Sequence, residues 1–303
     1  MLVKLCVVCG AEFDAYRPNQ RYCSGCRQEG RRRRERKSGD LFALPPVSPT
    51  TFVRKSITKA LDGECAVIIS DLQYPFHDQK TWRAVVGFID DFDPDLIVWN
   101  GDIGDFYSIS VFDKNPKRAF NLSDELWGLE RFLASYRMRW GDAKHYFILG
   151  NHEERLESFI KKTPELTGLV DLDSVLHLSA QEFNVLPYGG ILEYLGFAIT
   201  HGTRFSSLPN GTAKMHAQTI GGSGVVGHSH RLGSYTYTDL RGTHTFFEGG
   251  CLCRLDPDYV KQRPPNWQQG FLYMVAHKNK AHCRLVHIYD DGFWAEGKFY
   301  GRK

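Results

Sequence analysis

Polar motifs follow apolar runs repeatedly between residues 70 and 230, and this alternation limits what the chain can fold into. Three continuous apolar runs, typical of strands buried on both faces, lie at residues 65–69, 96–99 and 146–149. The stretches with helical spacing that come after them are 80–90, 123–139 and one that begins at 155. Strand, polar loop and helix in alternation predict βαβ units, and ligand sites in such sheets gather at the carboxyl ends of the strands.

Five polar motifs carry the functional signal. They are Asp71-Leu72-Gln73 with His77 beyond it, Gly101-Asp102-Ile103-Gly104-Asp105, Gly150-Asn151-His152-Glu153, His201-Gly202 and Gly227-His228-Ser229-His230. In order and residue type they resemble the calcineurin-like metallophosphoesterases, including those carried by bacteriophages. The resemblance implies an α/β fold, a four-layer αββα sandwich. In the second half of the chain, sequence patterns typical of strands are more frequent than in the first.

The resemblance also implies a pair of divalent metal ions, for which Mn, Fe, Zn and Ni all stay open. Carboxylate, amide and imidazole donors suit such ions. Asp102 would bridge the two metals. The other ligands implied are Asp71 and His230 for the first metal, and Asn151, His201 and His228 for the second.

The first motif departs from the family pattern, in which Asp-x-His places a histidine on the first metal. Gln73 stands at that position, and His77 follows a turn predicted around Pro75. Gln73 supplies an amide oxygen, His77 loops back, or the first metal is weakly held. Of these we favour His77, as a ligand or a substrate contact.

His152 adjoins Asn151, but the resemblance implies that it faces the substrate. A bridging hydroxide would attack phosphorus while His152 protonates the departing oxygen as general acid. Asp105 would orient His152. Arg155, one helical turn later, is either a bidentate contact to a substrate phosphate or a surface arginine of the helix.

Four cysteines near the N-terminus predict a zinc-ribbon-like module over residues 1–29. Two CxxC pairs separated by thirteen residues are formed by Cys6, Cys9, Cys23 and Cys26. Disulfides are not expected in a chain without a secretory signal, and four thiolates suit one tetrahedral structural Zn²⁺. Free thiols and an iron centre are the alternatives.

A basic and proline-rich linker is predicted over residues 30–60, before a phosphoesterase domain over 61–303. The linker opens with a basic run: Arg31, Arg32, Arg33, Arg34, Arg36 and Lys37. Residues 1–40 hold ten lysines and arginines against five acidic residues, which is typical of a segment that contacts a polyanion. Nucleic acid is therefore the expected partner, and a solvated linker behind a protein-binding zinc knuckle is the alternative.

These features predict a metal-dependent enzyme that hydrolyses phosphodiester bonds in nucleic acid. The alternatives are a phosphatase acting on phosphoproteins or nucleotides, and a catalytically impaired nucleic-acid-binding protein, which Gln73 alone favours. DNA or RNA, endo- or exo-cleavage and the oligomeric state stay open. No apolar run approaches the roughly 20 residues of a membrane span, so we expect no membrane partner and a cytoplasmic location, in the host if the chain is phage-encoded.

Overall fold

The computed structural model describes residues 2–7, 9–15, 23–26, 52–111, 121–166, 168, 170–256 and 265–302. It divides into two compact units, Met1–Thr51 and Phe52–Lys303. The sequence predicts a linker as far as residue 60, whereas the second unit begins earlier. Strand β3 (Arg54–Ile57) pairs with a strand of that unit. Its residues are mostly exposed because it is an edge strand. Exposed positions do not require apolar side chains, so no apolar run marks this strand in the sequence.

The first unit contains a small hairpin, and the first cysteine pair, Cys6 and Cys9, lies in the connection between its two strands. Strands β1 (Leu2–Leu5) and β2 (Glu12–Ala15) pair antiparallel. Between them the backbone nitrogen of Gly10 donates to the carbonyl oxygen of Cys6 at 2.9 Å, with Gly10 at a φ of 72°. Glycine adopts this left-handed conformation without steric cost. The predicted basic run, residues 31–37, lies outside the described residues.

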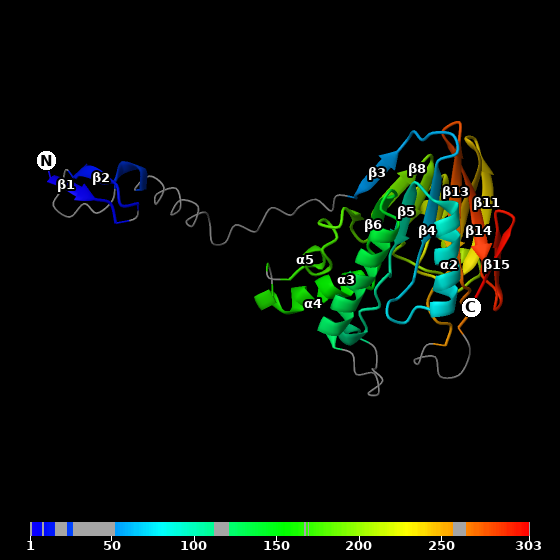
Figure 1. The fold of residues 1–303 in the computed structure, drawn as a ribbon. Helices are drawn as coiled ribbons and strands as arrows, with labels where there is room; N and C mark the ends of the chain where they lie inside the picture. Colours follow the sequence, from blue (N-terminus) through cyan, green and yellow to red (C-terminus); the bar gives the residue numbers. More distant parts are fainter. Residues whose placement is uncertain are drawn as a thin grey trace. The chain divides into compact units, whose positions relative to one another are not determined.

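The second unit is built on two six-stranded sheets (Figure 1). Across the first sheet the strands are β14 (Lys280–His287), β13 (Gly270–His277), β4 (Cys65–Ile69), β5 (Leu96–Asn100), β6 (Lys144–Ile148) and β7 (Asn184–Leu186). Strands β4 to β7 run parallel, and β13 lies antiparallel to β4. The three predicted apolar strands are therefore neighbours, and their carboxyl ends meet at one edge.

The second sheet brings two further strand ends to the site. Its strands, in order, are β11 (Leu232–Asp239), β12 (Gly242–Gly249), β10 (Ser223–Val226), β9 (Phe197–Thr200), β8 (Ile191–Tyr194) and β3. Strands β9 and β10 pair in parallel, so the loops that follow them leave the sheet at the same edge. Those loops carry the His201 and His228 motifs.

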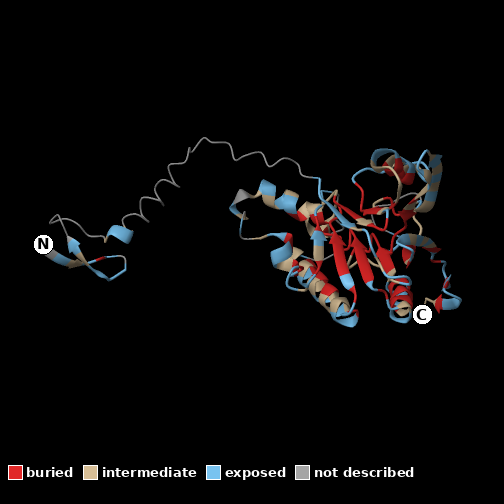
Figure 2. Ribbon diagram, turned by 90° about the horizontal axis from the view of Figure 1, so that it is seen from above, coloured by how far each residue is buried: buried red, intermediate tan, exposed pale blue. Residues whose placement is uncertain are grey.

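Helices cover the outer face of each sheet, which gives the four layers that the resemblance implies. The helices on the first sheet are α2 (Gln79–Phe92), α3 (Leu122–Arg139), α4 (Glu153–Lys162) and α5 (Leu172–Leu176), with 3₁₀ turns at Tyr107–Ile109 and Pro164–Leu166. Helix α6 (Gly211–Ile220) packs on the second sheet, and a hairpin of β15 (Gly292–Ala295) and β16 (Lys298–Gly301) packs beside α2. In Figure 2 the central strands are buried along most of their length, whereas the helices are buried on one side.

Helix α2 illustrates how the sequence fixes this arrangement. Asp78 caps its first turn by accepting hydrogen bonds from the backbone nitrogens of Lys80 and Thr81. Its buried face includes Trp82 and Phe88, which pack on the first sheet. Burying each such side chain contributes about 1.5–3 kcal/mol. None of the helices in the described ranges is long and apolar enough to cross a membrane.

The two sheets enclose a second apolar core. Every second residue of β4 and β5 points to the other sheet. Among them, Ile68 and Val98 pack in one cluster with Leu192 and Ile199. All four side chains are fully buried. Strands that are packed on both faces require the continuous apolar runs seen in the sequence. This rigid double sheet is the frame that holds the motif loops.

Candidate metal centre and catalytic site

The motif residues stand where strands of both sheets end. Asp71, Asp102 and Asn151 follow β4, β5 and β6, while His201 and His228 follow β9 and β10. The predicted placement of the motifs at carboxyl strand ends is therefore observed. The two sheets deliver these five side chains to one place from far apart in the sequence.

The backbone at these positions is held in a conformation that non-glycine residues rarely adopt. Left-handed φ angles, between 52° and 67°, occur at Asp71, Gln73, Asp102, His228 and His230. Each such residue costs on the order of 1 kcal/mol or more, and strain of this kind gathers at functional sites. The surrounding sheets must therefore hold the loops firmly in place.

One group of potential metal ligands is formed by Asp71, Asp102 and His230, whose ligand atoms all lie within 4.8 Å of one another. The Nε2 atom of His230 lies 3.1 Å from Oδ1 of Asp71. Gln73 reaches the same place, with its Nε2 atom 3.2 Å from Nε2 of His230. The amide of Gln73 is therefore at the edge of this first group.

A second group consists of Asp102, His201 and His228, again within 4.8 Å of one another. Oδ1 of Asp102 lies 3.3 Å from Nε2 of His201. Oδ1 of Asn151 lies 3.2 Å from the same nitrogen. Asp102 belongs to both groups, which is the position a bridging carboxylate needs.

Electrostatics at these groups favour cations. Burial opposes ionisation of Asp102, but His152 and His201 outweigh it and hold the pKa of its carboxyl well below the ordinary value. Burial lowers the pKa of His201, but Asp102 outweighs it and raises that pKa to about 10. Burial, reinforced by His201, lowers the pKa of His228 to about 4. Nδ1 of His228 is buried and has no hydrogen-bond partner among the described residues. Two buried carboxylates among imidazoles form a donor set that fits two divalent ions.

His152 stands beside both groups at the start of α4. Its Nδ1 atom lies 3.1 Å from Oδ1 of Asp105, and its Nε2 atom lies 3.5 Å from Oδ2 of Asp102. Arg155 donates to Nε2 of His152 at 2.8 Å and to the carbonyl oxygen of Asp105 at 2.7 Å. Arg155 thus contacts the predicted acid and its predicted orienting residue, rather than projecting from the helix surface.

His77 is a member of none of the ligand groups found among the described residues. Its ring stacks on Tyr74 at a centroid distance of 5.6 Å and contacts Phe132 at 5.4 Å. Burial lowers the pKa of His77 to about 4. The backbone nitrogen of Phe76 donates to the carbonyl oxygen of Gln73, so the chain turns where Pro75 predicts a turn. In this structure the turn directs the His77 ring into an aromatic cluster, and Gln73 remains beside His230.

Sequence comparisons agree with this site. A model of the calcineurin-like phosphoesterase family matches residues 66–255, which include all five motifs. The chain belongs to the calcineurin-like phosphoesterase family. The Gene 54 protein of Mycobacterium phage D29 is 32% identical over 251 residues, covering 76% of this chain and 96% of that protein. The Gene 54 protein of Mycobacterium phage L5 is 29% identical over 254 residues, covering 77% and 97%.

Among solved structures, vacuolar protein sorting 29 of Cryptosporidium parvum matches 79% of this chain and 95% of its own, at 14% identity and a TM-score of 0.43. The assignment to the calcineurin-like phosphoesterase family rests on the family model and the phage relatives. Membership of that family implies divalent metals in a dinuclear site. It does not determine the substrate.

One residue of this calcineurin-like site has no role in the sequence prediction. Glu153 is fully buried, and its carboxylate accepts hydrogen bonds from four backbone nitrogens. Three belong to the Asp102 loop, at Asp102, Ile103 and Gly104, and the fourth is that of Gly150. Glu153 thus fastens two motif loops together. Two features of the sequence could have indicated this role. Glu153 is the last residue of a motif, and it is an acidic residue at the N-terminus of a helix.

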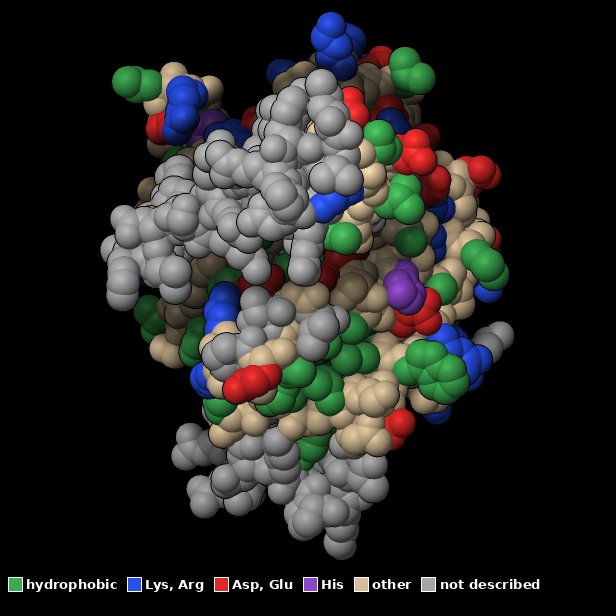
Figure 3. Space-filling model, turned by 90° about the vertical axis from the view of Figure 1, so that its left-hand side faces the viewer, with side chains coloured by type: hydrophobic (Ala, Val, Ile, Leu, Met, Phe, Trp, Pro, Cys, Tyr) green, Lys and Arg blue, Asp and Glu red, His purple; other side chains and the backbone are tan. Residues whose placement is uncertain are grey.

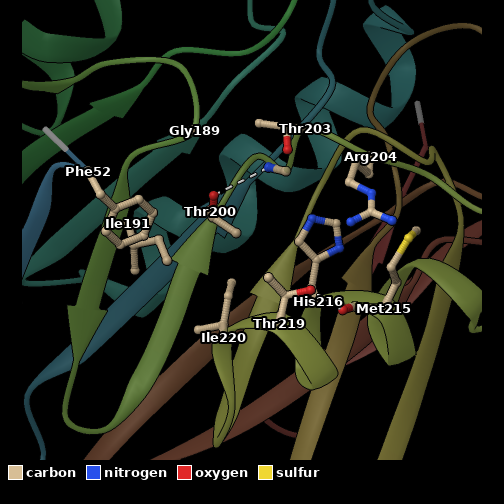
Figure 4. A pocket seen from close by; sticks show the side chains of 11 residues that line it. Phe52, Gly189, Ile191, Thr200, Thr203, Arg204, Met215, His216, Thr219 and Ile220 are labelled. Carbon is tan, nitrogen blue, oxygen red and sulfur yellow. Dashed lines mark hydrogen bonds between the residues drawn. The ribbon is translucent and has the colours of Figure 1, made fainter. Parts of the chain in front are cut away.

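A small cavity of about 110 Å³ lies behind the His201–Gly202 motif of this family member (Figure 4). Thr200 accepts a hydrogen bond from the backbone nitrogen of Gly202 at 3.3 Å. Across from it, His216 donates from Nδ1 to the carbonyl oxygen of Thr212. Burial lowers the pKa of His216, so its ring is held in the neutral form. The cavity is a packing feature behind a candidate ligand.

Two buried cysteines also approach the first metal group. Cys251 and Cys253 lie with His230 in a group of potential ligands within 4.8 Å of one another. Sγ of Cys253 is 3.8 Å from Nδ1 of His230, the ring atom opposite the one that faces Asp71. The spacing of these two cysteines in the sequence does not reveal this contact, because it does not show that the His230 loop lies beside them.

The N-terminal cysteines come together as the CxxC spacing predicts. All four ligand atoms of Cys6, Cys9, Cys23 and Cys26 lie within 4.8 Å of one another. The sulfurs of Cys9 and Cys23 are 3.8 Å apart, and the backbone nitrogen of Cys26 donates to Sγ of Cys23. The cluster is compatible with a zinc module, and four thiolates fit a tetrahedral ion.

Proposed function

We propose that this calcineurin-like phosphoesterase is a phosphodiesterase that cleaves nucleic acid. The observation that carries the proposal is the shared position of Asp102 in two ligand groups beside His152. This arrangement would hold two cations next to a group that can donate a proton. A phosphate bound there would face both.

The ligand assignment follows the two groups. Asp102 would serve both ions, Asp71 and His230 would hold the first with Gln73 at its edge, and Asn151, His201 and His228 would hold the second. When bound, the two ions supply the positive charge that polarises the phosphate and activates water. Because Gln73, and not His77, lies beside His230, we assign the amide of Gln73 to the first ion.

The side chains around the proposed ions would orient the substrate phosphate and protonate the leaving oxygen. His152 would deliver a proton to the departing oxygen, and Asp105, whose Oδ1 lies 3.1 Å from Nδ1, would orient the ring through its charge. Arg155 supplies a guanidinium whose two nitrogens can contact a phosphate in a bidentate manner once it releases His152. Glu153 holds the two loops in register.

Nucleic acid is the proposed polymer because of the N-terminal part of the chain. The cysteine cluster at residues 1–29 is compatible with a zinc module, and the run at residues 31–37 supplies positive charge. On the face of the molecule in Figure 3, basic and acidic side chains of the described residues are interspersed. The concentrated positive charge of this run is the kind of segment that contacts a polyanion. The phage relatives support a location in the cytoplasm of an infected host.

Hydrolysis by protein stripped with a chelator and resupplied with Mn²⁺ tests the proposal. The substrates are bis-p-nitrophenyl phosphate, p-nitrophenyl phosphate, and labelled single- and double-stranded DNA and RNA. We expect metal-dependent cleavage of the diester and of a polymer, and none by Asp102→Asn. Turnover of the monoester alone would indicate a phosphatase. Binding of polymer without turnover under any metal would indicate an impaired enzyme.

A further inference from the structure

Two aromatic side chains lie directly against candidate metal ligands. The ring of Phe205 meets the ring of His228 edge-on, at a centroid distance of 5.7 Å and an angle of 71°. The ring of Trp267 lies 4.2 Å from that of His230, at an angle of 58°. One aromatic ring thus stands beside a ligand of each proposed ion. They come from different loops, one before α6 and one before β13.

Arg231 ties these two loops together. Its Nη1 atom donates to the carbonyl oxygen of Ser206 at 2.8 Å, and its Nε atom donates to that of Asn266 at 3.2 Å. Ser206 follows Phe205, and Asn266 precedes Trp267. One guanidinium, directly after His230 in the chain, therefore braces both aromatic residues. Such bracing places the rings before a ligand arrives, which lowers the cost of binding.

The exposure of Phe205 is unusual for a residue held in this way. Its ring is 65% exposed, and Leu208 on the same loop is 68% exposed. The histidine it touches, His228, is half-buried and belongs to the second ligand group. An apolar ring presented to solvent at the rim of a phosphate site matches a ligand that has both a flat apolar part and a phosphate.

We propose that Phe205 and Trp267 form a stacking subsite for the nucleobase next to the scissile phosphate. The inference rests on the proposed function and narrows it: the substrate carries a base on the nucleoside attached to that phosphate. Aromatic stacking accepts every base, because each has a π-face. The subsite therefore favours nucleic-acid strands and nucleotides over phosphoproteins, without selecting a sequence.

The test compares two diesters that share a leaving group. Thymidine 5′-p-nitrophenyl phosphate carries a base, and methyl p-nitrophenyl phosphate does not. The readout is the ratio of kcat/KM for the two substrates. We expect Phe205→Ala and Trp267→Ala each to lower this ratio about tenfold, mainly through KM of the thymidine substrate. Phe205→Tyr and Trp267→Phe each keep an aromatic ring, so they should keep the ratio near the wild-type value.

Matched controls use exposed apolar residues away from the motif loops. Trp294 on β15 is 70% exposed, and Leu240 in the turn between β11 and β12 is fully exposed. Trp294→Ala and Leu240→Ala should leave the ratio unchanged. If Phe205→Ala lowers the kcat/KM of both substrates equally, the ring supports the metal centre and the stacking proposal is overturned.

A wild-type protein that turns over neither diester would contradict the proposed function, and binding then tests the subsite separately. The probe is a labelled single-stranded oligothymidylate, compared with an abasic oligonucleotide of equal length in chelator. Stacking predicts that wild type prefers the strand with bases and that Phe205→Ala loses this preference. Equal affinity of wild type for both strands would overturn the stacking proposal.

Discussion

Arg155 donates a hydrogen bond to Nε2 of His152 at 2.8 Å, so this imidazole nitrogen is an acceptor in the structure. A guanidinium has only donors, which leaves the proton of a neutral ring on Nδ1, toward Asp105. The nitrogen proposed to protonate the leaving group is thus occupied by an arginine. A phosphate that draws Arg155 to itself would free Nε2 to take up a proton from solvent, which His152 could then pass to the leaving group, so substrate binding and loading of the acid would be linked.

Replacing His152 tests the acid directly. We expect His152→Ala to lower kcat about 10²–10⁴-fold on a diester with a poor leaving group, such as a dinucleotide. The loss should be smaller for p-nitrophenyl esters, whose leaving group needs little protonation. Metal content, measured by mass spectrometry, should stay at the wild-type value. An unchanged rate on the dinucleotide would remove His152 from the chemistry.

Gln73 and His77 should respond differently to truncation. Gln73→Ala should weaken binding of one of two Mn²⁺ ions about 10–100-fold, because the amide lies beside His230. His77→Ala should leave metal affinity unchanged and cost about 1–3 kcal/mol of stability, because the ring packs on Tyr74 and Phe132. Calorimetric titration with Mn²⁺ and urea unfolding measure the two effects. The reverse pattern would return His77 to the ligand set.

Glu153 should matter more for stability than its neighbour. Glu153→Gln replaces one of two accepting oxygens with an amide that faces backbone donors, so we expect a loss of about 1–3 kcal/mol in urea unfolding. Glu154, whose contact is a partly exposed ion pair with Lys161, is the matched control. Glu154→Gln should cost at most about 1 kcal/mol. Equal costs would mean that the four amide contacts contribute no special stability.

His145 predicts a pH dependence of folding. Burial lowers the pKa of its ring to about 4, against about 6.5 in the unfolded chain. The unfolded state therefore binds the proton first, and stability is full above pH 6.5 and falls as pH drops toward 4, by up to about 3 kcal/mol. Unfolding of metal-free protein at several pH values, beside His145→Gln, measures this. A variant with the wild-type slope would assign the acid sensitivity to other groups.

The cysteine cluster should be separable from catalysis. Cys9→Ser should remove one equivalent of bound zinc, because Cys9 and Cys23 are neighbours in the cluster. Turnover of methyl p-nitrophenyl phosphate should be unchanged, since the cluster belongs to the other compact unit. Zinc content and rates on the same sample test both statements. A variant that keeps its zinc would show that the thiols do not hold it.

Apolar runs made the three central parallel strands of the first sheet predictable, because strands buried on both faces contain few polar residues. Elements that lack such a run could not be predicted in this way. Strand β3 is an exposed edge, and α6 buries small and polar residues such as Ala213 and Thr212 in place of large apolar ones at helical spacing. Neither leaves a periodic apolar signal.

Within the site, the sequence predicts which residue types gather, but not the direction of each side chain. His77 is close to Gln73 in sequence, yet a turn and an aromatic cluster take its ring elsewhere. The approach of Trp267 to His230 depends on pairing between distant segments. The spacing of residues along the sequence does not predict such long-range contacts.

Strand β13 lies beyond residue 255, where the family match ends, yet it pairs along β4. Leu272 stands opposite Ile68, three residues before Asp71, and both side chains are fully buried. A fragment cut to the matched segment would leave β4 as a bare apolar edge with unpaired backbone groups, a template for aggregation. The smallest piece of this chain that can be expressed and assayed is therefore longer than the segment that the family model matches: it must run through both C-terminal strands of the first sheet.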